Sequence, residues 1–160
     1  MALPDADLQK MLERMLSLGA EGMKVPPPVF VDMQTEILDY SAGEGDHHIG
    51  ATLLARFPNL ERYQNPMALM QGGIIAAAVD GVVGPLSFMV APPSVTAQLA
   101  MTYLAPVTEA MPHIDVEATL THRAGRQLVF DAVVRSPEGD DLAVARMTQT
   151  VVRRAQEASG

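Results

Sequence analysis

The sequence predicts a single α+β domain in which an antiparallel sheet wraps around one central apolar helix, with an additional helix near the N-terminal end. Residues 72–89 are the most apolar run of the chain, and a helix that is apolar on every side must be surrounded by other elements. Four runs of alternating apolar residues follow, and such alternation indicates strands. The turns between these runs are too short to connect parallel strands, so neighbouring strands are expected to be antiparallel.

The segment before the apolar helix is expected to contain one helix and two strands. Apolar residues at helical spacing predict an amphipathic helix over residues 4–22. They are Leu8, Met11, Leu12, Met15, Leu16 and Leu18. Three consecutive prolines, 26–28, indicate a stiff linker. A strand is expected over residues 31–40, a hairpin loop over 41–46, and a second strand over 49–57, where apolar residues alternate.

Four strands are expected after the apolar helix. Three of them each present one apolar face, made by Ala97, Leu99, Met101 and Tyr103, by Val116, Ala118, Leu120 and His122, and by Leu128, Phe130, Ala132 and Val134. The last strand covers about residues 141–152. Ala124-Gly125 and residues 137–140 are typical of tight turns. This order of elements favours the hotdog architecture, in which an antiparallel sheet wraps around a helix.

Length and composition are those of one globular domain. The chain has 160 residues, of which 48% are hydrophobic and 19% are charged. We expect an N-terminal helix and Pro-rich linker over residues 1–28, the main domain over 29–154, and a flexible C-terminal tail over 155–160.

Charge and cysteine content exclude several function classes. The 19 acidic and 11 basic residues give a net charge of −8, so nucleic acid and anionic membrane surfaces are poor partners. The absence of cysteine excludes a disulfide scaffold, a thiol nucleophile and a cysteine-based zinc site. The first residues, MALPDADLQK, lack the basic start and apolar run of a signal peptide, so we expect a cytoplasmic location.

The apolar stretch 72–91 is about as long as a membrane span. Asp80 is the only charged residue between Arg62 and Glu109. The stretch nevertheless contains this acid in its middle, Pro85 and several glycines. A buried core helix therefore explains it better than a bilayer span, and no membrane association is expected.

The short motifs of several enzyme classes are absent from the sequence, among them G-x-S-x-G, Walker A, G-x-G-x-x-G and H-E-x-x-H. His47 and His48 are adjacent, so on a strand they point to opposite faces and cannot bind one metal ion together. A surface or loop pair is the favoured interpretation. His113 and His122 have no obvious partner, and no metal or cofactor is expected.

Asp80 stands out because it lies in IIAAAVDGVVG, the most apolar run of the chain. A carboxylate there is costly to bury unless it is hydrogen-bonded, paired or functional. Periodicity alone leaves three readings open: a functional acid, a helix residue that faces solvent, and a buried acid bonded to a neighbouring strand.

Two glycines, Gly72 and Gly73, follow Gln71 at the expected start of the apolar helix. Glycines at a helix start let a ligand approach the backbone closely. Free N–H groups and the positive helix end can hold a developing oxyanion. An ordinary glycine turn is the alternative.

Together these features resemble the signature of the PaaI-type hotdog thioesterases, which have an Asn, then His-Gly-Gly or Gln-Gly-Gly, then an acid on the central helix. The matching residues are Asn65, Gln71, Gly72 and Asp80, and the likeness covers about residues 59–152. Residues 95–106 resemble the family's strand after the helix, and Arg123-Ala124-Gly125-Arg126 resembles its Gly-Arg hairpin.

This resemblance implies hydrolysis of an acyl-CoA thioester to free acid and CoA. The Gly72 N–H would polarise the thioester carbonyl, Asp80 would act as general base or as nucleophile, and Asn65 would orient the water or the carbonyl. Gln71 stands where many members have His, so it would order the loop as an amide. Gly84 stands where some relatives carry a hydroxyl residue, which leaves water orientation to Asn65 or to the backbone.

The spacing of Gly72 and Asp80 predicts a site shared by two subunits. The two residues are eight positions apart, or roughly 12 Å along one helix. One small acyl carbonyl cannot contact both groups, so they must come from different chains if both act on it. We expect a homodimer, and the resemblance also implies a pairing of dimers into a dimer of dimers.

CoA is strongly anionic, so an acidic protein needs local positive charge to bind it. Arg123 and Arg126 flank the turn at Gly125 and are the best candidates for phosphate contacts, with solvated strand-end charge as the alternative. Met70, together with Met67 and Met89, is expected to line the acyl pocket or else to fill the core.

Two other functions stay open at this point. A hotdog hydratase uses an Asp and a His together, and no His follows Asp80 within a turn or two. A non-catalytic acyl-CoA-binding module is the second alternative. It would be expected to lose Asp80 or Asn65, and both are present. Thioester hydrolysis is therefore the favoured function.

Overall fold

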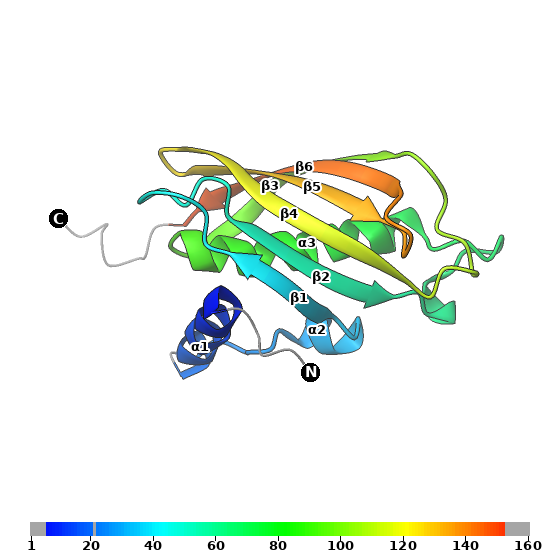
Figure 1. The fold of residues 1–160 in the computed structure, drawn as a ribbon, viewed down its shortest axis with the longest axis horizontal. Helices are drawn as coiled ribbons and strands as arrows, with labels where there is room; N and C mark the ends of the chain where they lie inside the picture. Colours follow the sequence, from blue (N-terminus) through cyan, green and yellow to red (C-terminus); the bar gives the residue numbers. More distant parts are fainter. Residues whose placement is uncertain (1–5, 21, 153–160) are drawn as a thin grey trace.

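The computed structural model of the chain describes residues 6–20 and 22–152 (Figure 1). The helices are α1 (Ala6–Ala20), α2 (Pro28–Asp32), the single 3₁₀ turn η1 (Glu61–Tyr63) and α3 (Gly72–Val90). The strands are β1 (Glu36–Ser41), β2 (Thr52–Pro58), β3 (Ser94–Tyr103), β4 (His113–Ala124), β5 (Gln127–Arg135) and β6 (Asp141–Val151).

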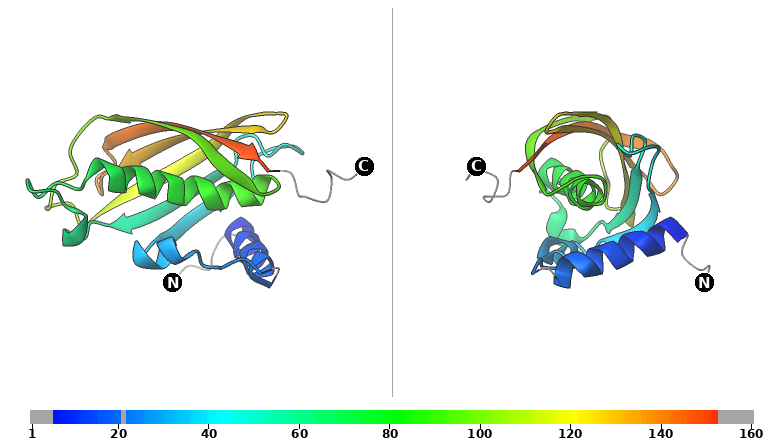
Figure 2. Two further views of the ribbon diagram at one scale, coloured as in Figure 1. Left: turned by 180° about the vertical axis from the view of Figure 1, so that it is seen from behind. Right: turned by 90° about the vertical axis from the view of Figure 1, so that its left-hand side faces the viewer.

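One six-stranded sheet makes up the body of the molecule, in the order β1-β2-β4-β5-β6-β3. All five neighbouring pairs are antiparallel. Figure 2 shows the sheet curving around α3, which lies along its concave face. The predicted α+β class and the wrapping of an antiparallel sheet around a central helix are confirmed.

The core lies between α3 and the concave face of the sheet. The helix buries Val79, Val82 and Leu86, and the strands bury alternate residues such as Phe57 and Phe130. Each such side chain contributes on the order of 1.5–3 kcal/mol by leaving water. The predicted inward residues Leu128, Phe130, Ala132 and Val134 are all buried.

The predicted start of the first strand is wrong. Residues 31 and 32 belong to the short helix α2, and β1 begins only at Glu36. Pro28 occupies the first turn of α2, where its fixed φ and missing N–H suit a helix start. Phe30 is buried and anchors this helix, and Gln34 with φ of 51° turns the chain into β1.

The segment before β2 is a loop rather than strand. Ile49 makes only an isolated bridge to Glu44, and β2 begins at Thr52. His48 has a φ of 56°, and its ring nitrogen Nδ1 lies 3.0 Å from the Ala42 carbonyl oxygen. The histidine pair therefore lies in a loop, as the favoured interpretation predicted.

Two β-bulges interrupt the predicted alternation. In β3 the register shifts between Thr96 and Gln98, so Thr96 and not Ala97 reaches toward α3. In β4 the register shifts between Leu120 and His122, and His122 is exposed although the residues before it on that face are buried. Simple alternation could not reveal either shift.

α3 continues through Pro85 and ends at Val90, so the proline does not shorten it. The helix is long and apolar enough to cross a membrane by length and composition. In the fold it packs against the sheet, and 44% of its most apolar window is buried there. The predicted core helix is confirmed, although Gly73 and Asp80 on it stay exposed within one chain.

The convex face of the sheet carries ion pairs between neighbouring strands. Arg146 donates two hydrogen bonds to the Asp131 carboxylate, at 2.7 and 2.9 Å. These bonds hold the pKa of Asp131 below its ordinary value, against a smaller opposing effect of burial. Arg56 makes a similar bidentate pair with Asp115. Such pairs connect neighbouring strands and order the outer face.

The proposed division of the chain into residues 1–28, 29–154 and 155–160 stays a prediction. α1 packs against β1 through the fully buried Met11, so the N-terminal helix is part of the folded body. The predicted tail lies outside the described residues.

Candidate active site

The first turn of α3 presents free backbone donors. Gln71 is the residue before the helix, and its carbonyl accepts the Ile74 N–H at 2.9 Å. Among the described residues, the N–H groups of Gly72 and Gly73 have no hydrogen-bond partner. This is the pattern expected of an α-helix start, where the first N–H groups point out of the helix. The site therefore offers the donors that the sequence predicted.

Gln71 does not use its side chain to build this turn. It is exposed, and it makes no side-chain hydrogen bond as the helix cap. Its backbone N–H, which donates to the Tyr63 carbonyl at 2.8 Å, fixes the loop instead. The predicted loop-ordering role of the Gln71 amide has no contact to support it within the described chain.

Tyr103 at the end of β3 fixes the position of Gly72. Its hydroxyl donates a hydrogen bond to the Gly72 carbonyl at 2.7 Å. A Cβ atom at Gly72 would lie 3.1 Å from Tyr103 Cζ, so a larger residue there would have to displace the ring by a few tenths of an ångström. The carbonyl of Gly72 and the N–H of Gly73 belong to one peptide group, so this bond also orients a free donor.

Asn65 orders the loop that precedes α3. Its Oδ1 accepts the N–H groups of Met67 and Leu69 at 2.9 and 3.2 Å. The side-chain oxygen is therefore engaged, and only the Nδ2 amine has no hydrogen-bond partner within the described residues. Asn65 can donate to a carbonyl or to a water, but it is not placed to accept a proton from one.

A small cavity of about 330 Å³ lies over the start of α3. Asn65, Met70, Gly72 and Tyr103 line it, so the structure brings together three of the predicted site residues and one that was not predicted as such. Gly73 is exposed beside it, and a Cβ atom at Gly73 would meet nothing within 4 Å.

Asp80 does not open into this cavity. It is exposed, and the Thr96 hydroxyl donates a hydrogen bond to its Oδ1 at 2.8 Å. It lines a separate groove of about 470 Å³, together with Gly81 and Phe30. Of the three readings that the sequence left open for Asp80, burial is excluded within one chain. Asp80 and Gly72 therefore line different cavities of the same chain.

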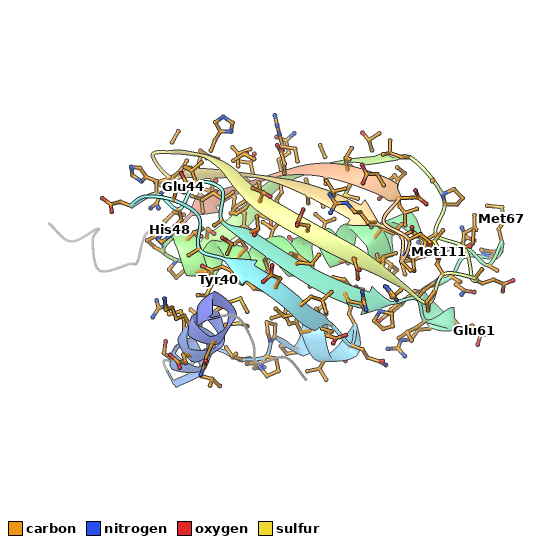
Figure 3. The ribbon with its side chains drawn as sticks, viewed as in Figure 1. Tyr40, Glu44, His48, Glu61, Met67 and Met111 are labelled. Atoms are coloured by element: carbon orange, nitrogen blue, oxygen red, sulfur yellow. The ribbon has the colours of Figure 1, made fainter. Side chains whose placement is uncertain are left out.

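The three methionines do not form one pocket. Met70 is buried and lines the cavity over Gly72. Met67 is 72% exposed, and Figure 3 shows it at the opposite end of the molecule from His48. Met89 lines a third cleft, near His48. The three methionines therefore cannot all line one cavity of a single chain, and a role of any of them in an acyl pocket stays a prediction.

The two candidate phosphate ligands are in different situations. Arg123 donates from Nη1 to the Val90 carbonyl at 3.0 Å, so part of its guanidinium caps the end of α3. Arg126 is exposed and lines the third cleft, of about 810 Å³, beside Arg14 and His48. Gly125 has a φ of 57° and forms the turn between β4 and β5. Arg126 also donates a hydrogen bond, from Nε to the Val151 carbonyl at 3.0 Å, but it is the more exposed cation of the two.

Sequence reasoning missed Thr96 as a contact of Asp80 and gave Tyr103 no role at Gly72. The bulge in β3 changes which residues face α3, and nothing in the alternating pattern marks it. Among the described residues, no group of three His, Asp or Glu side chains is arranged to hold a metal ion.

Comparison with known proteins rests on structure, because no protein-family model and no curated protein sequence matches the chain. The E. coli PaaI protein from the phenylacetic acid degradation operon superposes with a TM-score of 0.73 at 12% identity, over 88% of this chain and 95% of that one. The protein smu.793 from Streptococcus mutans UA159, bound to acetyl-CoA, gives 0.67 at 17% identity, over 82% and 94%. The thioesterase HI1161 from Haemophilus influenzae gives 0.68 at 18% identity, over 80% and 85%.

The chain has a hotdog fold. In this hotdog domain the central helix carries a free backbone N–H at its first residue and an exposed carboxylate two turns later. The sheet leaves that side of the helix uncovered, and β3 forms one open edge of the sheet beside it.

Proposed function

We propose that two copies of this chain hydrolyse an acyl-CoA thioester to a free acid and CoA. The observation that carries the proposal is the placement of two complementary groups on one helix. The free N–H of Gly72 and the exposed carboxylate of Asp80 open into different cavities. A dimer that brings Gly72 of one chain near Asp80 of the other would contain two complete sites, each with one group from each chain.

The open edge of β3 is a suitable surface for this pairing. β3 has ten residues, and most of them are exposed. Val95 and Tyr103 are 55% and 49% exposed. A long edge strand with apolar side chains is a template for pairing with another chain. We propose a homodimer through this edge and the uncovered face of α3, and a dimer of dimers as its further assembly.

The Gly72 N–H would bind the thioester carbonyl oxygen. As the attacking group adds, that oxygen becomes an oxyanion, and the positive end of α3 stabilises it. The carbon–sulfur bond then breaks, and CoA leaves as a thiolate that takes up a proton. Asn65 lines the same cavity, and its Nδ2 amine would orient the carbonyl or the water.

Asp80 of the other chain would provide the attack. As general base it takes a proton from water while the water oxygen bonds to the carbonyl carbon. As nucleophile its oxygen bonds to that carbon and gives a mixed anhydride, which water then hydrolyses. Thr96 holds Oδ1, so Oδ2 is the oxygen left for either route.

Two further points support CoA as the carrier. The neighbour smu.793 was solved with acetyl-CoA bound. In this chain Arg126, next to Arg14 and His48, provides the positive charge that phosphate groups need. We keep Arg126 as the first candidate for a phosphate contact and Arg123 as the second.

The test of the proposal is thiol release from a panel of acyl-CoAs by mixed dimers. Asp80→Asn chains and Gly72→Pro chains are each expected to be nearly inactive alone. After denaturation, mixing and refolding, about half of the dimers contain one chain of each kind, and each of these has one complete site. Activity should therefore return to about a quarter of the wild-type value.

Two outcomes would contradict the proposal. A mixture that stays inactive while mixed dimers form would exclude a shared site. A well-folded wild-type dimer that cleaves no thioester would exclude the activity, and tight acyl-CoA binding without turnover would then favour the binding module.

The Tyr103 hydroxyl is expected to position the donors at Gly72. Tyr103→Phe keeps the ring on Gly72 and removes one hydrogen bond, which is worth about 1 kcal/mol and should lower kcat by about fivefold with little change in KM. Tyr63→Phe is the matched control, because the Tyr63 hydroxyl also donates to a backbone carbonyl, that of Asp32, at 2.9 Å. Equal kcat for the two variants would exclude the positioning role.

A further inference from the structure

The groove beside Asp80 is built by a part of the chain that lies outside the sheet. Its volume is about 470 Å³, within the usual range for small-molecule pockets. α3 forms one side of it, and Met15 of α1 and Phe30 of α2 contribute to the other. Figure 2 shows α1 and α2 beside α3, past the β1 edge of the sheet. The N-terminal segment thus forms a wall next to the proposed catalytic carboxylate.

The lining of this groove is almost entirely apolar. Among the described residues that line it, only Asp80 and Lys24 are charged, and the rest are hydrophobic side chains, prolines and glycines. The α3 side is kept open by a small residue one turn after Asp80. A Cβ atom at Gly84 would meet nothing within 4 Å, so free space continues along the helix from the carboxylate.

We propose that this groove holds the acyl group of the substrate, and that the acyl group is an uncharged hydrocarbon chain considerably longer than acetyl. This inference rests on the proposed function, because it places the thioester carbon next to Asp80. From that point the acyl chain would extend past Gly84 toward the wall formed by α1 and α2, where the lining is apolar. The pantetheine arm of CoA, which carries two amides, is poorly matched to this lining.

Chain-length dependence is the first test. Each buried methylene is worth about 0.8 kcal/mol, which corresponds to about fourfold in kcat/KM. We expect kcat/KM to rise by about this factor per methylene from acetyl-CoA through butanoyl-CoA to octanoyl-CoA, and to level off when the groove is full. A flat series, or acetyl-CoA as the best substrate, would overturn the inference.

A matched pair of variants tests whether this groove causes the preference. Val29 and Val31 both lie on α2 and are 48% and 62% exposed, but only Val29 lines the groove. Val29→Trp should lower the octanoyl-to-acetyl ratio of kcat/KM at least tenfold by filling the space. Val31→Trp should leave this ratio unchanged. Equal ratios in the two variants, or an equal loss for every acyl length in Val29→Trp, would place the acyl group elsewhere.

Binding of S-alkyl-CoA thioethers, which cannot be hydrolysed, separates this inference from the proposed function. Affinity should rise with alkyl length, and Val29→Trp should abolish the rise. If this pattern is found in a protein that cleaves no thioester, the groove assignment stands and the hydrolytic function fails. If thioesters are cleaved but affinity is independent of alkyl length, the function stands and the groove assignment fails.

Discussion

Replacing Asp80 with asparagine is expected to lower kcat for acyl-CoA hydrolysis by about 10²–10⁴-fold, the usual contribution of a general base. The amide has the shape of the carboxylate, and its Oδ1 can still accept the hydrogen bond from Thr96. The variant should therefore fold and assemble like the wild type. Thiol release measured at saturating substrate, together with the oligomeric state, tests this expectation.

Asp39→Asn is a suitable control for this substitution. Asp39 is also an exposed aspartate, but it lies on β1 and lines none of the three cavities discussed above. It changes the net charge by the same amount and should leave kcat unchanged. An Asp80→Asn variant with wild-type kcat would remove Asp80 from the mechanism, whichever of its two roles is considered.

Replacing Gly72 with proline is expected to lower kcat by about 10²–10³-fold, the cost of losing one oxyanion donor. Proline removes the N–H and is otherwise well suited to the first position of a helix. The preceding residue, Gln71, has φ of −65° and ψ of 136°, an extended conformation that also suits a following proline.

Gly72→Ala separates the loss of the donor from crowding. Both variants add a Cβ atom about 3.1 Å from Tyr103 Cζ, so both displace the ring by a similar amount. Only proline removes the N–H group. The ratio of kcat between the alanine and proline variants therefore reports the donor alone, and a ratio near one would show that the Gly72 N–H does not stabilise the oxyanion.

The sequence was most informative where burial follows a simple period. The central helix, the four strands after it and the buried face of β5 follow from apolar spacing, because one face of each element must pack against the core. The start of α2 was missed because a proline run suits both a linker and a first helical turn.

Contacts between distant parts of the chain could not be predicted in this way. Gly72 and Asp80 were found from their local context, the first by its paired glycines and the second by its apolar surroundings. Thr96 reaches Asp80 only because a bulge changes the face of β3. The three methionines lie in different surroundings, and their apolar character alone could not predict which cavity each of them lines.

The wall of the Asp80 groove has a consequence for how this protein can change over evolutionary time. Met15 and Phe30 belong to helices that precede the sheet in the sequence and contribute no strand to it. Side chains on the groove-facing side of this segment can therefore change in bulk while the strand pairing of the sheet stays the same. On the proposed function, changes in this wall would alter substrate preference, while the proposed catalytic groups on α3 are preserved.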